Sequence, residues 1–179
     1  MAQKTIPSGA RRLAKTDYRN LMRRRIRRIL LICSSYDAYT LEEDGRLEVQ
    51  INREYIELNL SNPPSFTRVS SSTEALELLQ GENDFDLVIS MFNVGDLDVF
   101  HFSKQLKALH PEIPFVLLTN FSKDIYRRIE GEDRSAIDYI FSWHGNADLI
   151  LAIVKLIEDR MNADDDILGV GVQSILLVE

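Results

Sequence analysis

Leu87-Val88-Ile89-Ser90-Met91, introduced by Asp86, is a short apolar run that predicts a strand buried on both faces. Ile29-Leu30-Leu31-Ile32-Cys33 has the same character nearer the N-terminus, and shorter runs at 66–69, 115–118 and 139–141 predict three more strands. Segments with helical periodicity follow the five strands, at about 47–60, 75–80, 99–109, 122–129 and 146–162. The alternation predicts an α/β domain in three layers, a doubly wound, five-stranded parallel sheet with helices on both faces.

Charge is divided unevenly along the 179 residues. Residues 1–28 contain ten Lys or Arg and a single acidic residue, whereas the remainder contains 11 basic and 27 acidic residues. The sequence therefore predicts a basic N-terminal arm at 1–28, interpreted as a helix, in front of an acidic domain at 29–162. The arm has irregularly spaced apolar residues along one side, which favours packing against protein. Binding of the arm to nucleic acid stays an alternative.

Cys33 is the only cysteine, so the chain can form neither an internal disulfide nor a thiolate metal cluster. This composition fits a reducing cytoplasm, and we interpret Cys33 as inert packing rather than a redox sensor. The longest apolar runs fall far short of the ~20 residues that a membrane-spanning helix needs. The sequence therefore predicts a cytoplasmic protein without a membrane segment.

The order of the predicted elements resembles the receiver domains of bacterial two-component response regulators. Three short sequence segments carry the resemblance. They are Arg68-Val69 with Thr73-Glu74-Ala75-Leu76, His110-Pro111-Glu112-Ile113-Pro114-Phe115, and Ala136-Ile137-Asp138-Tyr139-Ile140. The resemblance covers nearly the whole of residues 29–162. It implies a flavodoxin-like fold with the strand order 2-1-3-4-5.

The resemblance also implies where the groups of the receiver reaction belong. The acidic pair that binds Mg²⁺ aligns with Cys33 and Ser34, the phosphoacceptor aspartate with Met91, the hydroxyl with Thr119, and the lysine with Ser142. Only the hydroxyl remains, and a hard cation prefers carboxylate and water ligands that this set lacks. The resemblance therefore implies a degenerate pocket with no catalytic residue, no Mg²⁺ and no other cofactor.

A receiver-like order of elements without the groups of the receiver reaction predicts a pseudo-receiver. Such a domain is a non-catalytic module for protein–protein or intramolecular regulation in a larger bacterial signalling protein. The chain itself is then not an enzyme. Its expected partner is another protein or another domain of the same polypeptide, with a homodimer left open. Tyr139 and Trp143 are the candidate docking residues, although Trp143 is equally predicted to fill the vacated lysine site.

Two alternatives stay open. An active receiver with a displaced acceptor would carry its phosphate on Asp96 or Asp98. Residues 32–45 and 140–149 resemble the N-terminal region of large bacterial phosphoenolpyruvate-synthase-like proteins (PEP/pyruvate-binding), so the chain would then be the regulatory part of such a phosphotransferase. Residues 163–179 are predicted to form an acidic linker and the first strand of a second, truncated receiver domain.

Overall fold

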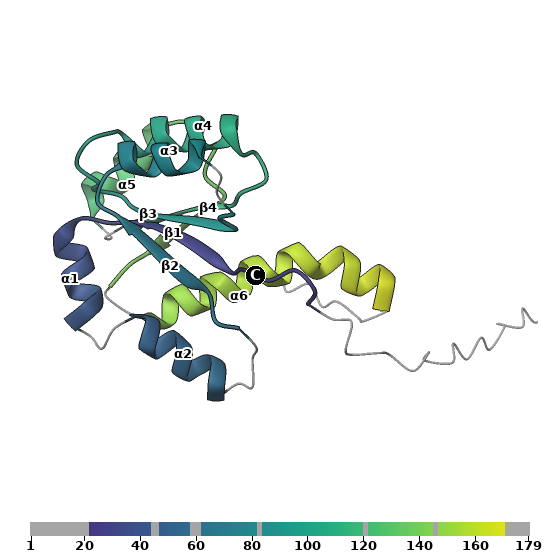
Figure 1. Ribbon diagram of the computed structural model, residues 1–179. Helices are drawn as coiled ribbons and strands as arrows, with labels where there is room; N and C mark the ends of the chain where they lie inside the picture. The colour runs from purple at the N-terminus through teal and green to yellow at the C-terminus, as the bar shows by residue number, and fades with distance from the viewer. Residues whose placement is uncertain are drawn as a thin grey trace, which may run out of the picture. The chain divides into compact units, whose positions relative to one another are not determined.

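The computed structural model describes residues 22–43, 47–57, 62–81, 84–119, 122–144 and 147–170 (Figure 1). The chain divides into two compact units, one running from Ile26 to Ile157 and the other made of Met1–Arg25 with Glu158–Glu179. The first unit contains the predicted α/β domain. The two units are described separately below.

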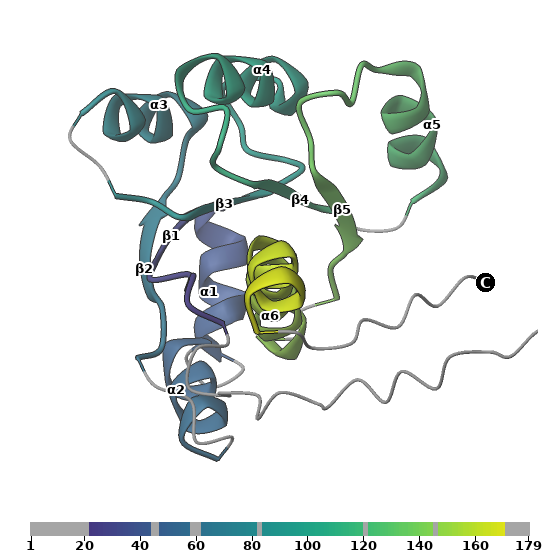
Figure 2. The same cartoon turned by 90° about the vertical axis from the view of Figure 1, so that its right-hand side faces the viewer.

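The first unit is built on one parallel sheet with the strand order β2-β1-β3-β4-β5. Its strands are β1 (Arg28–Ile32), β2 (Ser65–Val69), β3 (Leu87–Met91), β4 (Phe115–Thr119) and β5 (Tyr139–Ser142). The helices are α1 (Ser35–Glu43), α2 (Leu47–Glu57), α3 (Ser72–Gln80), α4 (Val99–Leu109), α5 (Lys123–Gly131) and α6 (Ala147–Asp165), of which α6 belongs to the second unit from Glu158 on. Figure 2 shows α3, α4 and α5 on one face of the sheet and α1, α2 and α6 on the other. The predicted three-layer, flavodoxin-like fold is confirmed.

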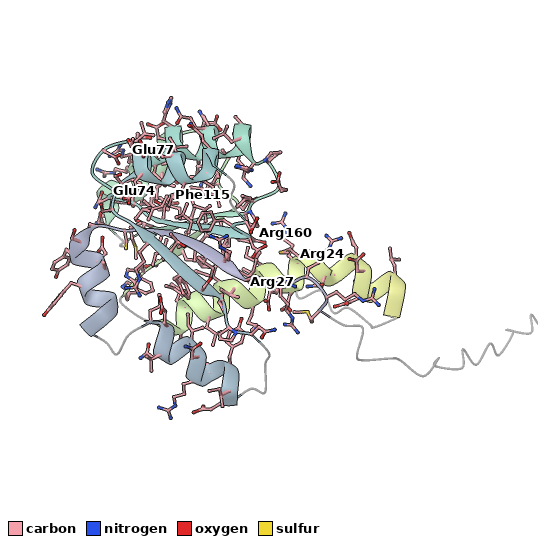
Figure 3. All side chains as sticks on the ribbon, viewed as in Figure 1. Arg24, Arg27, Glu74, Glu77, Phe115 and Arg160 are labelled. Carbon is pink, nitrogen blue, oxygen red and sulfur yellow. The ribbon has the colours of Figure 1, made fainter. Side chains whose placement is uncertain are left out.

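The core of this unit lies along the three central strands. Nearly every residue of β1, β3 and β4 is buried, as the continuous apolar runs predict for strands covered on both faces. The Phe115 ring at the start of β4 packs against the Phe102 ring of α4, with 5.6 Å between the ring centroids. Figure 3 shows Phe115 between the sheet and the helices α3 and α4.

Two aspartates that precede strands bind the first amide groups of neighbouring strands. One Asp86 carboxylate oxygen accepts hydrogen bonds from the Arg27 and Arg28 amides at 2.7 and 3.0 Å. Asp138 accepts from the Phe115 amide at 2.8 Å and from the Lys107 ammonium group at 2.7 Å. These side chains satisfy backbone donors at the amino ends of β1 and β4.

Helix α1 was not predicted from the sequence, and the following helix was predicted to extend to about residue 60. Helix α2 is described over Leu47–Glu57, and residues 58–60 lie outside the described residues. Among the described side chains of α1, Tyr36 and Tyr39 are 78% and 58% exposed, so they mark no buried face. A local polar pair marks its start instead. The Ser34 hydroxyl donates to the Asp37 carboxylate at 2.6 Å and accepts from the Asp37 amide at 3.1 Å.

In the second unit, the buried side chain of Asn162 holds the segment that precedes β1. Its amide oxygen accepts from the Arg24 amide at 2.8 Å, and its amide nitrogen donates to the Arg24 carbonyl at 2.7 Å. Arg25 forms a 3.2 Å ion pair with Glu158, which is 1% exposed. Backbone groups of the segment thus find partners without forming a helix.

These contacts correct two predictions at the ends of the domain. Residues 22–27 form no helix, so the helix predicted over 1–28 is wrong there, and residues 1–21 lie outside the described residues. Helix α6 runs to Asp165 and continues as a π-helix over Asp166–Val170, so the linker predicted at 163–179 is helical that far. The strand predicted near its end also lies outside the described residues.

Candidate functional site

The candidate site is the edge of the sheet where β1, β3, β4 and β5 end. Ile32 pairs with Ser90, which places Cys33 next to Met91, and Thr119 at the end of β4 pairs with Ser142 at the end of β5. Backbone hydrogen bonds continue the ladder beyond the strands, since the Phe92 and Trp143 amides donate to the Leu118 and Thr119 carbonyls at 2.8 Å. The structure therefore aligns the predicted pocket residues along one edge.

The side chains along this edge are mostly buried and uncharged. Cys33, Met91 and Thr119 are 2%, 5% and 6% exposed, and Ser34 and Ser142 are half-buried. The Ser34 hydroxyl is engaged with Asp37, and the Ser142 hydroxyl lies 3.0 Å from His144 Nε2. A thiol, a thioether and three hydroxyls offer no strong nucleophile for phosphorus and no carboxylate ligand for a hard cation.

Trp143 and Tyr139 occupy different environments. Trp143 is 6% exposed, so little of its ring reaches the surface, which argues against its predicted role as a docking residue. Its burial supports the other predicted role, which is to fill space beside the position where the receiver resemblance implies a lysine. Tyr139 is half-buried on the edge strand β5, where its ring stacks on Phe141 with 6.0 Å between centroids.

Asp96 lies in the loop after β3 and caps the neighbouring helix α3. Its two carboxylate oxygens accept from the Ser72 and Thr73 amides at 2.8 and 2.9 Å, while the Ser71 hydroxyl accepts from the Glu74 amide. Burial raises the pKa of Asp96, but the hydrogen bonds from Thr73 and Ser72 outweigh this effect and lower the pKa to about 2. The carboxylate is therefore a weak base held by helix amides.

Asp98 caps α4 and binds an arginine of α5. One carboxylate oxygen accepts from the Phe100 amide at 2.9 Å, and the other accepts from the Arg128 guanidinium group. The Arg128 guanidinium carbon lies 5.4 Å from the centroid of the Phe92 ring. These groups and the loop between them line an open, polar cavity of about 330 Å³. Asp98 is exposed to solvent, but both of its oxygens already have partners.

Replacing Asp96 with alanine is expected to lower the free energy of unfolding by about 1 kcal/mol at pH 7, the usual effect of losing a helix cap. The folded-state pKa of about 2 lies below the ordinary aspartate pKa of 3.8, so the contribution of Asp96 is complete above pH 4. It is lost as the pH falls from about 4 towards 2. Urea unfolding at pH 7, 4 and 2.5 measures this dependence.

In that series, the difference between wild type and Asp96→Ala is expected to shrink as the pH falls. Asp159→Ala is a matched control, because Asp159 lies on the exposed surface of α6 and forms no helix cap. A difference between wild type and Asp96→Ala that stays constant from pH 7 to 2.5 would contradict the capping role.

The sequence pattern left phosphorylation of Asp96 or Asp98 only as an alternative, and it did not predict the hydrogen-bond partners of either carboxylate. The position of Asp98 directly before an apolar helix is a capping signal that was available in the sequence. Nothing in the sequence indicated that Arg128, 30 residues away, would reach the Asp98 carboxylate. The same holds for the hydrogen bonds between Asp96 and the first amides of α3.

Among the described residues, no three His, Cys, Asp or Glu side chains gather where they could hold a metal ion. None of the described helices is long and apolar enough to cross a lipid bilayer.

The sequence matches no protein-family model and no curated protein. Solved structures do share the fold. A response-regulator receiver domain protein from Clostridium thermocellum is 19% identical, with a TM-score of 0.56, covering 77% of this chain and 98% of its own. A protein from Rhodopirellula baltica described as an adenylate cyclase is 14% identical, with a TM-score of 0.57, covering 80% of this chain and 98% of its own.

A streptococcal protein, from a family of redox sensors described as evolved from two-component response regulators, is 19% identical, with a TM-score of 0.59. The match covers 86% of this chain and 58% of that chain. At these identities the similarity establishes the receiver fold and no more.

Proposed function

We propose that this chain is a pseudo-receiver, a non-catalytic module that regulates by binding another protein or another domain of its own polypeptide. The observation that carries the proposal is the set of side chains at the carboxyl edge of the sheet. Cys33, Met91 and Ser142 stand where the receiver reaction needs a carboxylate, a nucleophilic aspartate and a lysine. The receiver fold supports a signalling module, and the substituted edge supports one that works without phosphoryl transfer.

Each substitution removes a different part of the reaction. The Met91 thioether has no oxygen that could attack phosphorus, and the Cys33 thiol is a poor ligand for Mg²⁺. Ser142 is neutral and cannot offset the charge of a phosphoryl group as a lysine would. Because the metal, nucleophile and counter-charge are all affected, the chain is expected to be no enzyme and to bind no Mg²⁺.

The displaced-acceptor alternative depends on Asp96 and Asp98, whose environments argue against it. A phosphoacceptor carboxylate has to be free to attack, whereas these two hold the first amides of α3 and α4. Phosphorylation would break those hydrogen bonds and uncap a helix. Asp37 is likewise engaged with the Ser34 hydroxyl.

The proposed docking surface is the edge formed by β5, with Tyr139 as its central residue. Its ring stacks on Phe141 and is half-buried, so part of it faces solvent. A half-exposed aromatic pair on an edge strand offers both apolar area and backbone groups to a partner. The partner is a protein surface or a neighbouring domain, and a second copy of the chain would form a homodimer.

A role as the regulatory part of a phosphoenolpyruvate-synthase-like phosphotransferase is compatible with this proposal and stays a prediction. It requires an ATP-binding region elsewhere in the same polypeptide. Cytoplasmic location also stays a prediction.

A thermal-shift titration with Mg²⁺ and beryllofluoride, a phosphoryl mimic, tests the absence of phosphoryl chemistry. A ligand at 100 times its dissociation constant adds about 2.7 kcal/mol to the stability, which raises the Tm of a domain of this size by roughly 5–10 °C. We expect no such rise, whereas a catalytically intact receiver in the same experiment shows one. A rise that requires both reagents and disappears in Asp96→Asn or Asp98→Asn would establish the displaced acceptor instead.

Sedimentation of the purified chain tests the docking surface for the case in which the partner is a second copy. Tyr139→Ala is expected to weaken self-association at least tenfold. Tyr36→Ala, which removes an exposed ring from α1 instead, is the matched control and is expected to leave it unchanged. Equal association of wild type and Tyr139→Ala would rule out the β5 edge as the dimer interface.

A further inference from the structure

A cavity of about 200 Å³ lies between α5 and β5. Its apolar wall is formed by Ile125 and Ile129 of α5 and by Ile140 and Phe141 of β5. Ile129 is buried and the other three are half-buried, so they present carbon surface to the cavity. A cavity of roughly 150 Å³ lined by such residues is large enough for benzene, so this one accommodates a ring with a small substituent.

Polar groups converge on the same cavity. Three hydroxyl-bearing residues line it, namely Ser122 and the pair Thr119 and Ser142, which face each other across β4 and β5. The Ser122 hydroxyl already caps α5, because it accepts from the Ile125 amide at 3.2 Å. An apolar wall with a few hydroxyls at the ends of two parallel strands is a typical arrangement for small-molecule sites.

Among the described residues that line this cavity, Arg134 is the only charged one, and its charge is positive. Its side chain is exposed, and no described carboxylate lies within ion-pair distance of its guanidinium group. Two nearby acids are engaged elsewhere, since Asp133 pairs with Lys104 at 3.0 Å and Glu130 binds the Tyr126 phenol. An available guanidinium group beside an apolar cavity favours a planar anion, because a carboxylate accepts two parallel hydrogen bonds from arginine.

We propose that the α5–β5 cavity binds a small organic carboxylate of about the size of benzoate. The carboxylate would pair with Arg134, and the apolar body would pack against Ile125, Ile129 and Ile140. Such a site gives the module a chemical input that does not require phosphorylation. The proposal does not require the docking role of β5, since it is argued from the cavity and its charge, although Phe141 belongs both to the cavity wall and to the pair with Tyr139.

The test is an NMR titration of the full chain, labelled at the isoleucine methyl groups, with sodium benzoate at constant ionic strength. We expect saturable shifts at Ile125, Ile129 and Ile140 and a dissociation constant in the millimolar range, as is usual for a ligand of about nine non-hydrogen atoms. Neutral benzamide, which has nearly the same shape, is expected to bind at least fivefold more weakly. The difference between the two probes isolates the contribution of the charge.

Arg134→Gln is expected to weaken benzoate binding at least fivefold and to abolish the preference over benzamide. The substitution is at an exposed position, so the fold is expected to survive. Arg127→Gln is the matched control. It also removes one arginine charge, but at a residue of α5 that does not line this cavity. Absence of saturable shifts at the three isoleucines, or benzoate binding by Arg134→Gln as strong as by wild type, would overturn the proposal.

Discussion

Replacing Met91 with aspartate is expected to destabilise the folded protein by about 3 kcal/mol at pH 7 without creating a phosphoacceptor. Met91 is 5% exposed and lies beside Cys33, which is 2% exposed, so a carboxylate there would be buried next to the uncharged side chains described at this edge. Burial raises the pKa of such an aspartate above its unfolded value. The destabilisation is therefore smallest below about pH 4 and grows as the pH rises.

Urea unfolding at pH 4 and pH 7 measures this effect, and Met91→Leu is its control. Leucine keeps the volume and polarity of the side chain and is expected to cost less than about 1.5 kcal/mol at either pH. Incubation of Met91→Asp with Mg²⁺ and acetyl phosphate is expected to yield no acid-labile phosphate. A stable Met91→Asp variant that is phosphorylated would show that the remaining groups at this edge still support the receiver reaction.

Replacing Phe115 with alanine is expected to lower the free energy of unfolding by about 3–5 kcal/mol, the range for truncating a fully buried phenylalanine. Phe115 is 0% exposed and packs on the Phe102 ring, so its loss leaves a cavity between β4 and α4. Equilibrium urea unfolding gives the value. A protein with the typical stability of 5–15 kcal/mol would lose a large part of it.

Phe115→Leu is the control for this prediction. It keeps the Phe115 amide and its hydrogen bond to Asp138, as alanine does, but fills most of the space. We expect it to cost about 1 kcal/mol. An alanine variant that loses less than the leucine variant would show that this part of the core rearranges to fill the cavity.

The fold was predictable because its strands are continuous apolar runs separated by helices. The run Leu87–Met91 has the same bounds in the sequence prediction and in the structure. Helix α1 was missed because its described tyrosines, Tyr36 and Tyr39, are exposed and mark no buried face. Its signal was local and polar, namely the pairing of Ser34 with Asp37.

Only those positions of the candidate site that follow from strand pairing could be predicted from the sequence. The ends of parallel strands meet at one edge, so the positions of Met91 and Thr119 followed from the strand order. The partners of Asp96 and Asp98 did not, because they come from elements 23–30 residues away with no shared pattern. The burial of Trp143 likewise depends on tertiary packing that no local pattern encodes.

Asp86 and Asp138 act at the amino ends of the strands, and the receiver chemistry belongs at the opposite ends. The carboxylate of each aspartate accepts a hydrogen bond from the amide of the residue that begins a neighbouring strand. The backbone amide of the same aspartate donates to the carbonyl of that residue. A slip of either strand by one residue would break these pairs, so they fix the register from the side away from the site. The residues that fix the strand register and the residues of the candidate site therefore lie at opposite ends of the strands. Side chains at the carboxyl ends can be substituted while the pairs at the amino ends keep the sheet in register.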